Sequence, residues 1–196
     1  RPAGLLGAGA AGRDALARHA DREAVSLLQA ALTQATTLAT DNPAGHLQLV
    51  DDLARARQRV GEYDVARSLW AQARLDAARL GDTSAIGRFE RRMGLCAFWS
   101  GRPREAVGHY DAAIAAARSA GALTTVVRAL VARGTALQSL GESDAAKASA
   151  GEALALAEST GDPALLARVH RALLLLFAWT GPADRARVHA VRALEH

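Results

Sequence analysis

The segment Gly61-Glu62-Tyr63-Asp64-Val65-Ala66, followed by Trp70 and Ala73, contains the pattern that decides the fold. Its glycine and alanine residues return along the chain at a constant step of 40 in the numbering. The recurring sets are Gly61, Gly101, Gly141 and Gly181; Gly81, Gly121 and Gly161; Ala66, Ala106, Ala146 and Ala186; and Ala73, Ala113, Ala153 and Ala193. Four sets that stay in phase over most of a chain indicate a protein built from structural repeats.

Each of these glycines is expected to end a helix, because glycine readily adopts the left-handed backbone that closes a last helical turn. The 19 residues between successive glycines allow a helix of about four turns and a short connection. The N-terminal region carries the same pattern, but its step to the next repeat is slightly longer. The matching residues are Ala24 with Ala66, Leu28 with Trp70, Ala31 with Ala73, and Ala35 with Ala77.

The pattern predicts five helical hairpins, over residues 3–38, 43–80, 83–120, 123–160 and 163–194. Stacked hairpins form a superhelix with a concave inner face, so we expect an all-α, right-handed αα-superhelix. No linker interrupts the repeat, which predicts a single domain over residues 1–196. Arg1-Pro2 suggests a piece cut from a longer protein, and residues 194–196 suggest a remnant of an expression tag.

The composition agrees with an all-α fold. Half of the 196 residues are hydrophobic and only 4% are aromatic, which suits close packing of alanine-rich helices and suits strands poorly. The formal net charge is +4, and Lys147 is the only lysine, so arginine supplies the other basic side chains. This net charge is modest for the chain length and does not by itself indicate binding to nucleic acid.

The cysteine content and hydropathy suggest a cytoplasmic protein. Cys96 is the only cysteine, so no disulfide forms within the chain, as is usual in a reducing compartment. The longest apolar run, residues 172–178, is far shorter than a membrane span. We therefore expect no membrane partner.

The stretch from Gly61 to Ala73 resembles the signature of the tetratricopeptide repeat (TPR) family. That signature is a glycine turn, an alanine five residues later, a bulky apolar residue and a second alanine. Its recurrence is seen at Gly101, Ala106, Tyr110 and Ala113, with Gly94 at the small position of the family's first helix. The repeat unit of this chain is longer than that of the family, which implies longer helices. The resemblance covers about residues 20–194 and implies a superhelix that binds a partner.

A narrower resemblance concerns residues 11–25. This stretch is similar to a junction in large bacterial regulators of the LuxR and SARP types, in which helical repeats follow an ATPase module. The resemblance implies that the chain is the sensor or interaction domain of a bacterial transcriptional regulator.

No residue pattern indicates catalysis, a metal or a cofactor. The run from Gly7 to Gly12 fits G-x-G-x-x-G, but no strand precedes it and no acidic residue stands about 20 residues on, as a dinucleotide site requires. Lys147 follows Ala146 rather than glycine, so the chain lacks a P-loop. His109 and His189 are two repeats apart, too far to share a metal ion. We expect no enzyme activity.

The predicted groove carries rows of arginine. In the TPR family the first helix of each hairpin lines the concave side, and one arginine recurs there at the step of the repeat as Arg88, Arg128 and Arg168. Arg91 and Arg171 form a second, partial row one turn further along. Such rows would attract carboxylates or phosphates through bidentate contacts. The alternative is an ordinary solvated face.

Two tryptophans also recur across two repeats. Trp99 and Trp179 end first helices and, with Phe98 and Phe177, could form an aromatic wall in the groove. The alternative, which we favour, is that these side chains pack in the hairpin core. Trp70 occupies the bulky core position of the TPR signature and is expected to be buried.

Three functions remain open at this point. The first is a protein-interaction or sensor module whose groove takes an acidic peptide or a neighbouring domain. The second is a small-ligand effector domain in which Trp99 and Trp179 stack on a metabolite. The third, binding of nucleic acid along the arginine rows, is the least expected of the three. The apolar run in the last predicted hairpin also leaves end-to-end pairing into a homodimer open.

Overall fold

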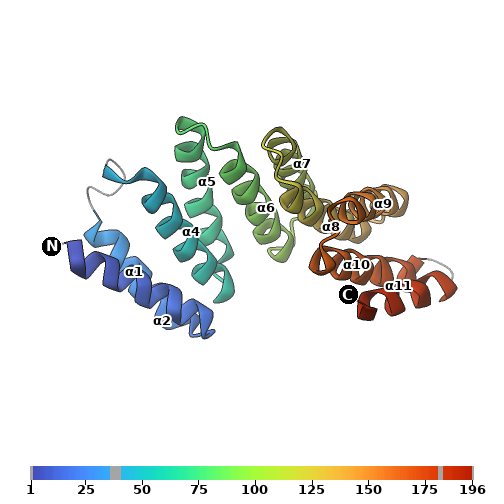
Figure 1. Ribbon diagram of the computed structural model, residues 1–196, viewed down its shortest axis with the longest axis horizontal. Helices are drawn as coiled ribbons and strands as arrows, with labels where there is room; N and C mark the ends of the chain where they lie inside the picture. Colours follow the sequence, from blue (N-terminus) through green and yellow to red (C-terminus); the bar gives the residue numbers. More distant parts are fainter. Residues whose placement is uncertain (1, 36–40, 181–182, 196) are drawn as a thin grey trace. The chain divides into compact units, whose positions relative to one another are not determined.

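A computed structural model describes residues 2–35, 41–180 and 183–195. In these ranges the chain is almost entirely helical and no strand occurs (Figure 1). The fold class is therefore all-α with TPR-like helical repeats, as the sequence predicted. None of the described helices is both long and apolar enough to cross a membrane.

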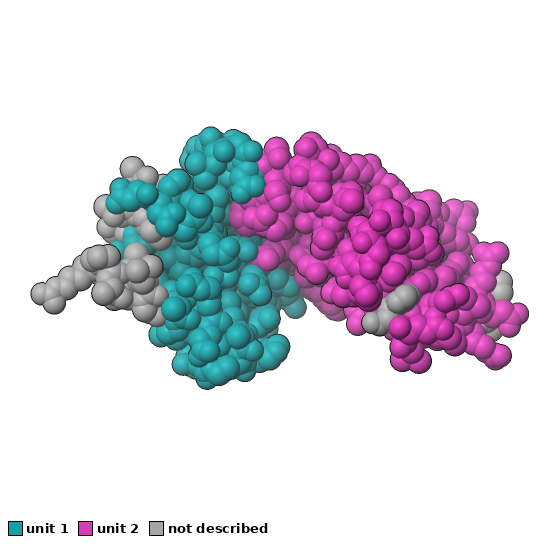
Figure 2. Space-filling model, viewed as in Figure 1, with its two compact units in different colours: residues 1–82 teal, residues 83–196 magenta. Residues whose placement is uncertain are grey.

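Residues 1–82 form a first compact unit, coloured teal in Figure 2. Its helices are α1 (Pro2–Ala17), α2 (Asp21–Gln34), α4 (Pro43–Arg59) and α5 (Tyr63–Arg79). Helix α1 pairs with α2, α4 pairs with α5, and α2 also packs against α4. The described residues of unit 1 therefore form two helical hairpins.

Residues 83–196 form a second compact unit, coloured magenta in Figure 2. Its helices are α6 (Thr83–Trp99), α7 (Pro103–Ser119), α8 (Leu123–Ser139), α9 (Ser143–Thr160), α10 (Pro163–Thr180) and α11 (Ala183–Glu195). They pair as α6 with α7, α8 with α9, and α10 with α11. The first helices of these hairpins also contact one another, α6 with α8 and α8 with α10. The expectation of one domain over residues 1–196 stays a prediction.

The glycine sets end helices as predicted. Six glycines have a positive φ between 64° and 87°: Gly61, Gly81, Gly101, Gly121, Gly141 and Gly161. Beside the first five of them, the N–H of the next residue donates to a carbonyl five residues earlier, as from Glu62 to Arg57 at 2.9 Å, whereas the N–H of Asp162 donates to Oγ1 of Thr160. The bond to the carbonyl satisfies one of the carbonyls that a helix end leaves free. Gly181 lies outside the described residues.

The turn between α1 and α2 differs, because His19 takes the left-handed conformation there, with φ of 60°. The register that matches Ala24 with Ala66 places His19 at the position of Gly61. The hydrogen bond that closes the turn is nevertheless the same, since the N–H of Ala20 donates to the carbonyl of Ala15 at 2.9 Å. Histidine thus adopts at this turn the backbone conformation that glycine adopts at the equivalent turns of the other repeats.

The alanine sets form the inner seams of the hairpins. Ala66, Ala106 and Ala146 are fully buried, and so are Ala113 and Ala153. Gly94 occupies the small position of the first helix. Only glycine fits there, because an added Cβ would lie 2.7 Å from Cε1 of Tyr110. Small side chains let paired helices approach closely enough to bury their larger neighbours.

Candidate functional site

The predicted arginine rows lie in unit 2, on the first helices of three successive hairpins. Helix α6 carries Arg88 and Arg91, α8 carries Arg128, and α10 carries Arg168 and Arg171. Because α8 contacts both α6 and α10, these helices place arginines from three repeats on adjoining elements. Arg91, Arg128, Arg168 and Arg171 are called the arginine cluster below.

The charges of the arginine cluster act on one another. Burial lowers the pKa of Arg91 to about 10, and the charges of Arg92, Arg128 and Arg168 contribute to this shift. Burial also lowers the pKa of Arg168, together with the charges of Arg128 and Arg171. Like charges in proximity make each additional proton less favourable. The four guanidinium groups therefore form one electrostatic group.

Carboxylates do not neutralise this group within the described part of the chain. Arg128, Arg168 and Arg171 make neither a hydrogen bond nor an ion pair with any residue described there. Arg88, in contrast, donates to Oγ of Ser84 at 3.1 Å, and its Cζ stands 6.0 Å from the centre of the Phe89 ring. By contrast, Arg133 of α8 is paired with Asp111 at 2.7 Å.

The aromatic residues do not behave as one group. Trp99 is 61% exposed, so our expectation that it packs in the core was wrong. It is the last residue of α6, and its ring meets that of Phe98 edge-on at 5.6 Å. Phe177 is buried, as expected for a core residue. The side chain of Trp179 lies outside the described residues.

The polar pairs that join the two helices of a hairpin were not predicted from the sequence, whereas Glu105, one turn before His109, was expected to make only a surface contact with it. Nδ1 of His109 lies 2.8 Å from a carboxylate oxygen of the buried Glu90, and its Nε2 lies 3.7 Å from Glu105. His189 faces His170, with their Nδ1 atoms 3.1 Å apart, and stacks on Phe177. Burial and the neighbouring His170 lower the pKa of His189. Each histidine thus has a partner in its own hairpin.

Unit 1 contains a polar pair with the same spacing in the sequence, 19 residues. There Nε1 of Trp70 donates to Oδ1 of Asp51 at 2.7 Å, and both side chains are buried, as expected for Trp70. In all three hairpins the partners across the turn are 19 residues apart. This spacing between facing helices is the signal that could have identified these pairs in the sequence.

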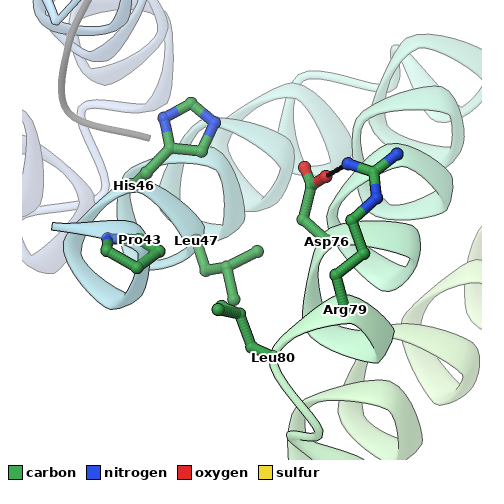
Figure 3. Close-up of a pocket in the computed structure, with 6 residues that line it drawn as sticks. All are labelled: Pro43, His46, Leu47, Asp76, Arg79 and Leu80. Carbon is green, nitrogen blue, oxygen red and sulfur yellow. Dashed lines mark hydrogen bonds and ion pairs between the residues drawn. The ribbon is translucent and has the colours of Figure 1, made fainter. Parts of the chain in front are cut away.

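A small cavity opens between α4 and α5 in unit 1. It has a volume of about 190 Å³ and is lined by Pro43, His46, Leu47, Asp76, Arg79 and Leu80. Figure 3 shows apolar side chains on one side of it and the Asp76–Arg79 pair on the other. That pair is joined by a hydrogen bond of 2.6 Å. With its charges paired, this cavity offers an apolar surface and no concentration of charge.

The glycine-rich run near the N-terminus serves helix packing. Gly7 to Gly12 lie within α1, so the run has none of the strand–turn–helix geometry of a dinucleotide site. A Cβ added at Gly12 would lie 2.6 Å from Cγ of Leu28. Cys96 is buried, and among the described residues no three His, Cys, Asp or Glu side chains are arranged to hold a metal ion.

No model of a known protein family matches the chain, and no curated protein matches it in sequence. Solved structures do match its fold. BtubC from P. vanneervenii is 21% identical with a TM-score of 0.77, over 94% of this chain and 76% of that one. A protein described as a kinesin light chain with nearly identical TPR-like repeats, from Podosopora anserina, is 19% identical with a TM-score of 0.73, over 100% and 95%.

A third similar structure is a Rap protein complexed with Competence and Sporulation Factor. It is 16% identical with a TM-score of 0.73, and the match covers 86% of this chain and 46% of that one. At such identities the likeness concerns the fold, which supports the TPR-like resemblance. The narrower resemblance to LuxR-type and SARP-type regulators has no support among these structures.

Proposed function

We propose that this chain is a protein-interaction module and that the arginine cluster of unit 2 binds a partner rich in carboxylates. The partner is an acidic peptide, or an acidic segment of a neighbouring domain. The observation that carries the proposal is the grouping of Arg91, Arg128, Arg168 and Arg171, whose charges interact without an acidic partner for three of them among the described residues.

Physical chemistry favours carboxylates as the partner groups. Each guanidinium presents donors in a planar fork that matches the two oxygens of a carboxylate. Spacing arginines over α6, α8 and α10 suits an extended segment with several acidic side chains better than a single anion. A bound acidic segment would also remove the mutual repulsion that the cluster carries on its own.

The fold supports the same class of function. The similar Rap protein was solved in a complex with Competence and Sporulation Factor, so a helical-repeat structure of this kind accommodates a bound factor. On this proposal the module works in the cytoplasm as the sensing or interaction part of a larger bacterial transcriptional regulator. That context rests on the resemblance of residues 11–25 alone.

The test is a binding titration with a fluorescently labelled glutamate-rich peptide at two salt concentrations. We expect Arg128→Glu to weaken binding at least tenfold and to reduce its dependence on salt, because one cationic contact becomes repulsive. The matched control is Arg104→Glu, which makes the same change of charge on α7, where Arg104 is well exposed and pairs with Glu142.

Equal weakening by both variants would mean that net charge alone attracts the peptide, and would contradict a site at the arginine cluster. So would an Arg128→Glu protein whose affinity and salt dependence match the wild type. If a single-stranded oligonucleotide of any sequence bound more tightly than the acidic peptide, nucleic acid would replace protein as the partner.

A second candidate function is the binding of a small metabolite against Trp99. The exposure of this side chain favours the candidate, because a large exposed aromatic ring offers a stacking surface for a planar ligand or a sugar. Quenching of tryptophan fluorescence by one member of a metabolite panel, lost in Trp99→Ala, would favour this function over peptide binding.

A further inference from the structure

Unit 1 contains a polar cavity that is separate from the arginine cluster. It lies between α1 and α4, has a volume of about 350 Å³, and falls at the lower end of the range of small-molecule sites. Its charged and apolar lining comes from Arg13, Leu16 and His19 on one side and from Asp52, Arg55 and Arg59 on the other. Three guanidinium groups thus meet around one small space.

Asp52 forms the floor of this cavity and is almost completely buried. Its Oδ1 accepts hydrogen bonds from Gln48 at 3.0 Å and from Arg55 at 3.4 Å. Its Oδ2 is buried without a hydrogen-bond partner, and Nη1 of Arg13 stops 3.9 Å away. Burial raises the pKa of this carboxyl group. A buried carboxylate with an unsatisfied oxygen is costly, which marks this position as more than packing.

The arginines around Asp52 retain donors for a ligand. Arg13 makes no hydrogen bond to any residue that the structure describes, and Arg55 makes only the one to Asp52. Arg59 is held in place by the carbonyl of Leu16 at 2.8 Å and by Asp21 at 3.1 Å. Asp52 therefore draws Arg13 and Arg55 towards the cavity without saturating them.

The free donors and the buried carboxylates together favour a small, singly charged anion. Arg13 and Arg55 keep guanidinium donors that match the two oxygens of a carboxylate. Asp51 and Asp52 carry negative charge close to these donors, so a dianion such as phosphate would meet more repulsion here than a monoanion does.

His19 adds an independent observation. His19 lines the same cavity, and its backbone has the left-handed conformation that glycine provides at the equivalent turns. Backbone strain of this kind persists where the side chain has a role. A histidine kept at this place, beside the arginines, fits a site for an anionic group.

We propose that unit 1 binds a small organic monocarboxylate in this cavity. Its carboxylate lies between Arg13 and Arg55, and its apolar part lies against Leu16. The site lies in a different unit from the arginine cluster and does not depend on the function proposed for that cluster, so either can fail alone.

The test uses butyrate, succinate and inorganic phosphate with the full chain, followed by heteronuclear NMR of backbone amides. We expect butyrate to shift the amides of residues 13–19 and 48–59 in a saturable manner, with weaker effects from succinate and phosphate. Arg55→Gln and Arg13→Gln should each raise the Kd for butyrate at least tenfold. Arg18→Gln is the matched control, because Arg18 follows α1 directly and pairs with the exposed Asp14.

Several results would overturn the proposal. One is the absence of saturable shifts at residues 13–19 and 48–59 with butyrate. Another is a Kd that Arg18→Gln raises as much as Arg55→Gln does, since this would indicate attraction by surface charge alone. Tighter binding of phosphate than of butyrate would contradict the preference for a singly charged anion. Amide spectra of each variant without ligand establish that it is folded. If Arg55→Gln does not fold, Arg13→Gln provides the test of the site.

Discussion

His19 shows how a single backbone angle can be at odds with its residue type. Its φ is 60°, in the region where a Cβ crowds the following carbonyl oxygen. The turn is nevertheless closed by the same hydrogen bond as the glycine turns, so the geometry is imposed by the hairpin and not by the residue. Glycine at this position would adopt the conformation without that crowding.

We therefore expect His19→Gly to stabilise the protein by about 1 kcal/mol. The measurement is the midpoint of urea unfolding, followed by circular dichroism. Gly61→His is the reciprocal control, since it places the same side chain in the equivalent turn, where φ is 87°, and should lower the midpoint. If His19→Gly destabilised the protein, the histidine side chain would be making a stabilising contact that outweighs the strain.

Trp99 marks a limit of sequence interpretation at the same scale. The repeat placed it correctly at the end of a first helix, but whether an end residue is covered depends on how far its neighbour extends. The extent of the elements packed around a residue depends on how helices are arranged in space, and the local sequence does not specify it. The exposure of Trp99 therefore had to come from the structure.

Glycines within the helices differ in whether they lie at a contact between two helices. Gly94 of α6 lies against Tyr110 of α7 so closely that a Cβ would come within 2.7 Å of the ring. Gly108 and Gly151 lie within α7 and α9 with no atom within 4 Å of an added Cβ. The same residue type thus has a packing role at the first position and none at the other two.

Alanine substitution should separate these roles. We expect Gly94→Ala to destabilise the protein by about 1–3 kcal/mol, because a methyl group would overpack the seam between α6 and α7. Gly108→Ala should stabilise it by about 0.5–1 kcal/mol, because alanine has the higher helix propensity. Thermal midpoints of both variants measure the effects. A stabilising Gly94→Ala would mean that the Tyr110 ring moves aside at little cost.

The sequence predicted the elements well for a physical reason. Glycines at a fixed step mark where helices end, and alanines at a fixed step mark where helices touch, so both signals are local. The polar pairs were missed because they depend on which faces of two helices meet. Glu90 and His109 are 19 residues apart and neither stands out in the sequence; only the hairpin brings them to 2.8 Å.

On the scale of the whole molecule, the charge is unevenly distributed between the two units. Residues 1–82 contain 10 basic and 10 acidic residues, whereas residues 83–196 contain 14 basic and 10 acidic residues. The entire net charge of +4 therefore belongs to the second unit, which also holds the arginine cluster. This supports placing a partner with several carboxylates at the arginine cluster.

The two candidate sites were not equally visible in the sequence. The arginine rows repeat at the same step as the fold, so their register could be predicted and their placement on α6, α8 and α10 followed. The cavity of unit 1 combines α1 with α4, across the place where the step of the repeat changes. Its residues share no period, and only the three-dimensional structure brings Arg13 to Asp52.

The excess of positive charge in unit 2 leads to a prediction about stability. Removing one charge from the arginine cluster should relieve repulsion, so Arg128→Gln should raise the free energy of unfolding by about 0.5 kcal/mol at low salt. Near 1 M salt the Debye length is about 3 Å and the gain should vanish. Urea unfolding at both salt concentrations provides the measurement.

Arg133→Gln is the control for that prediction, because it removes the same charge from the same helix. Arg133 is paired with Asp111 at 2.7 Å and donates to Ser149 at 2.9 Å. Its loss should therefore lower the free energy of unfolding by about 1 kcal/mol. If Arg128→Gln also destabilised the protein at low salt, the cluster would be neutralised within the chain itself. The acidic partner would then have no repulsion to relieve, and the case for it would rest on the geometry of the arginines alone.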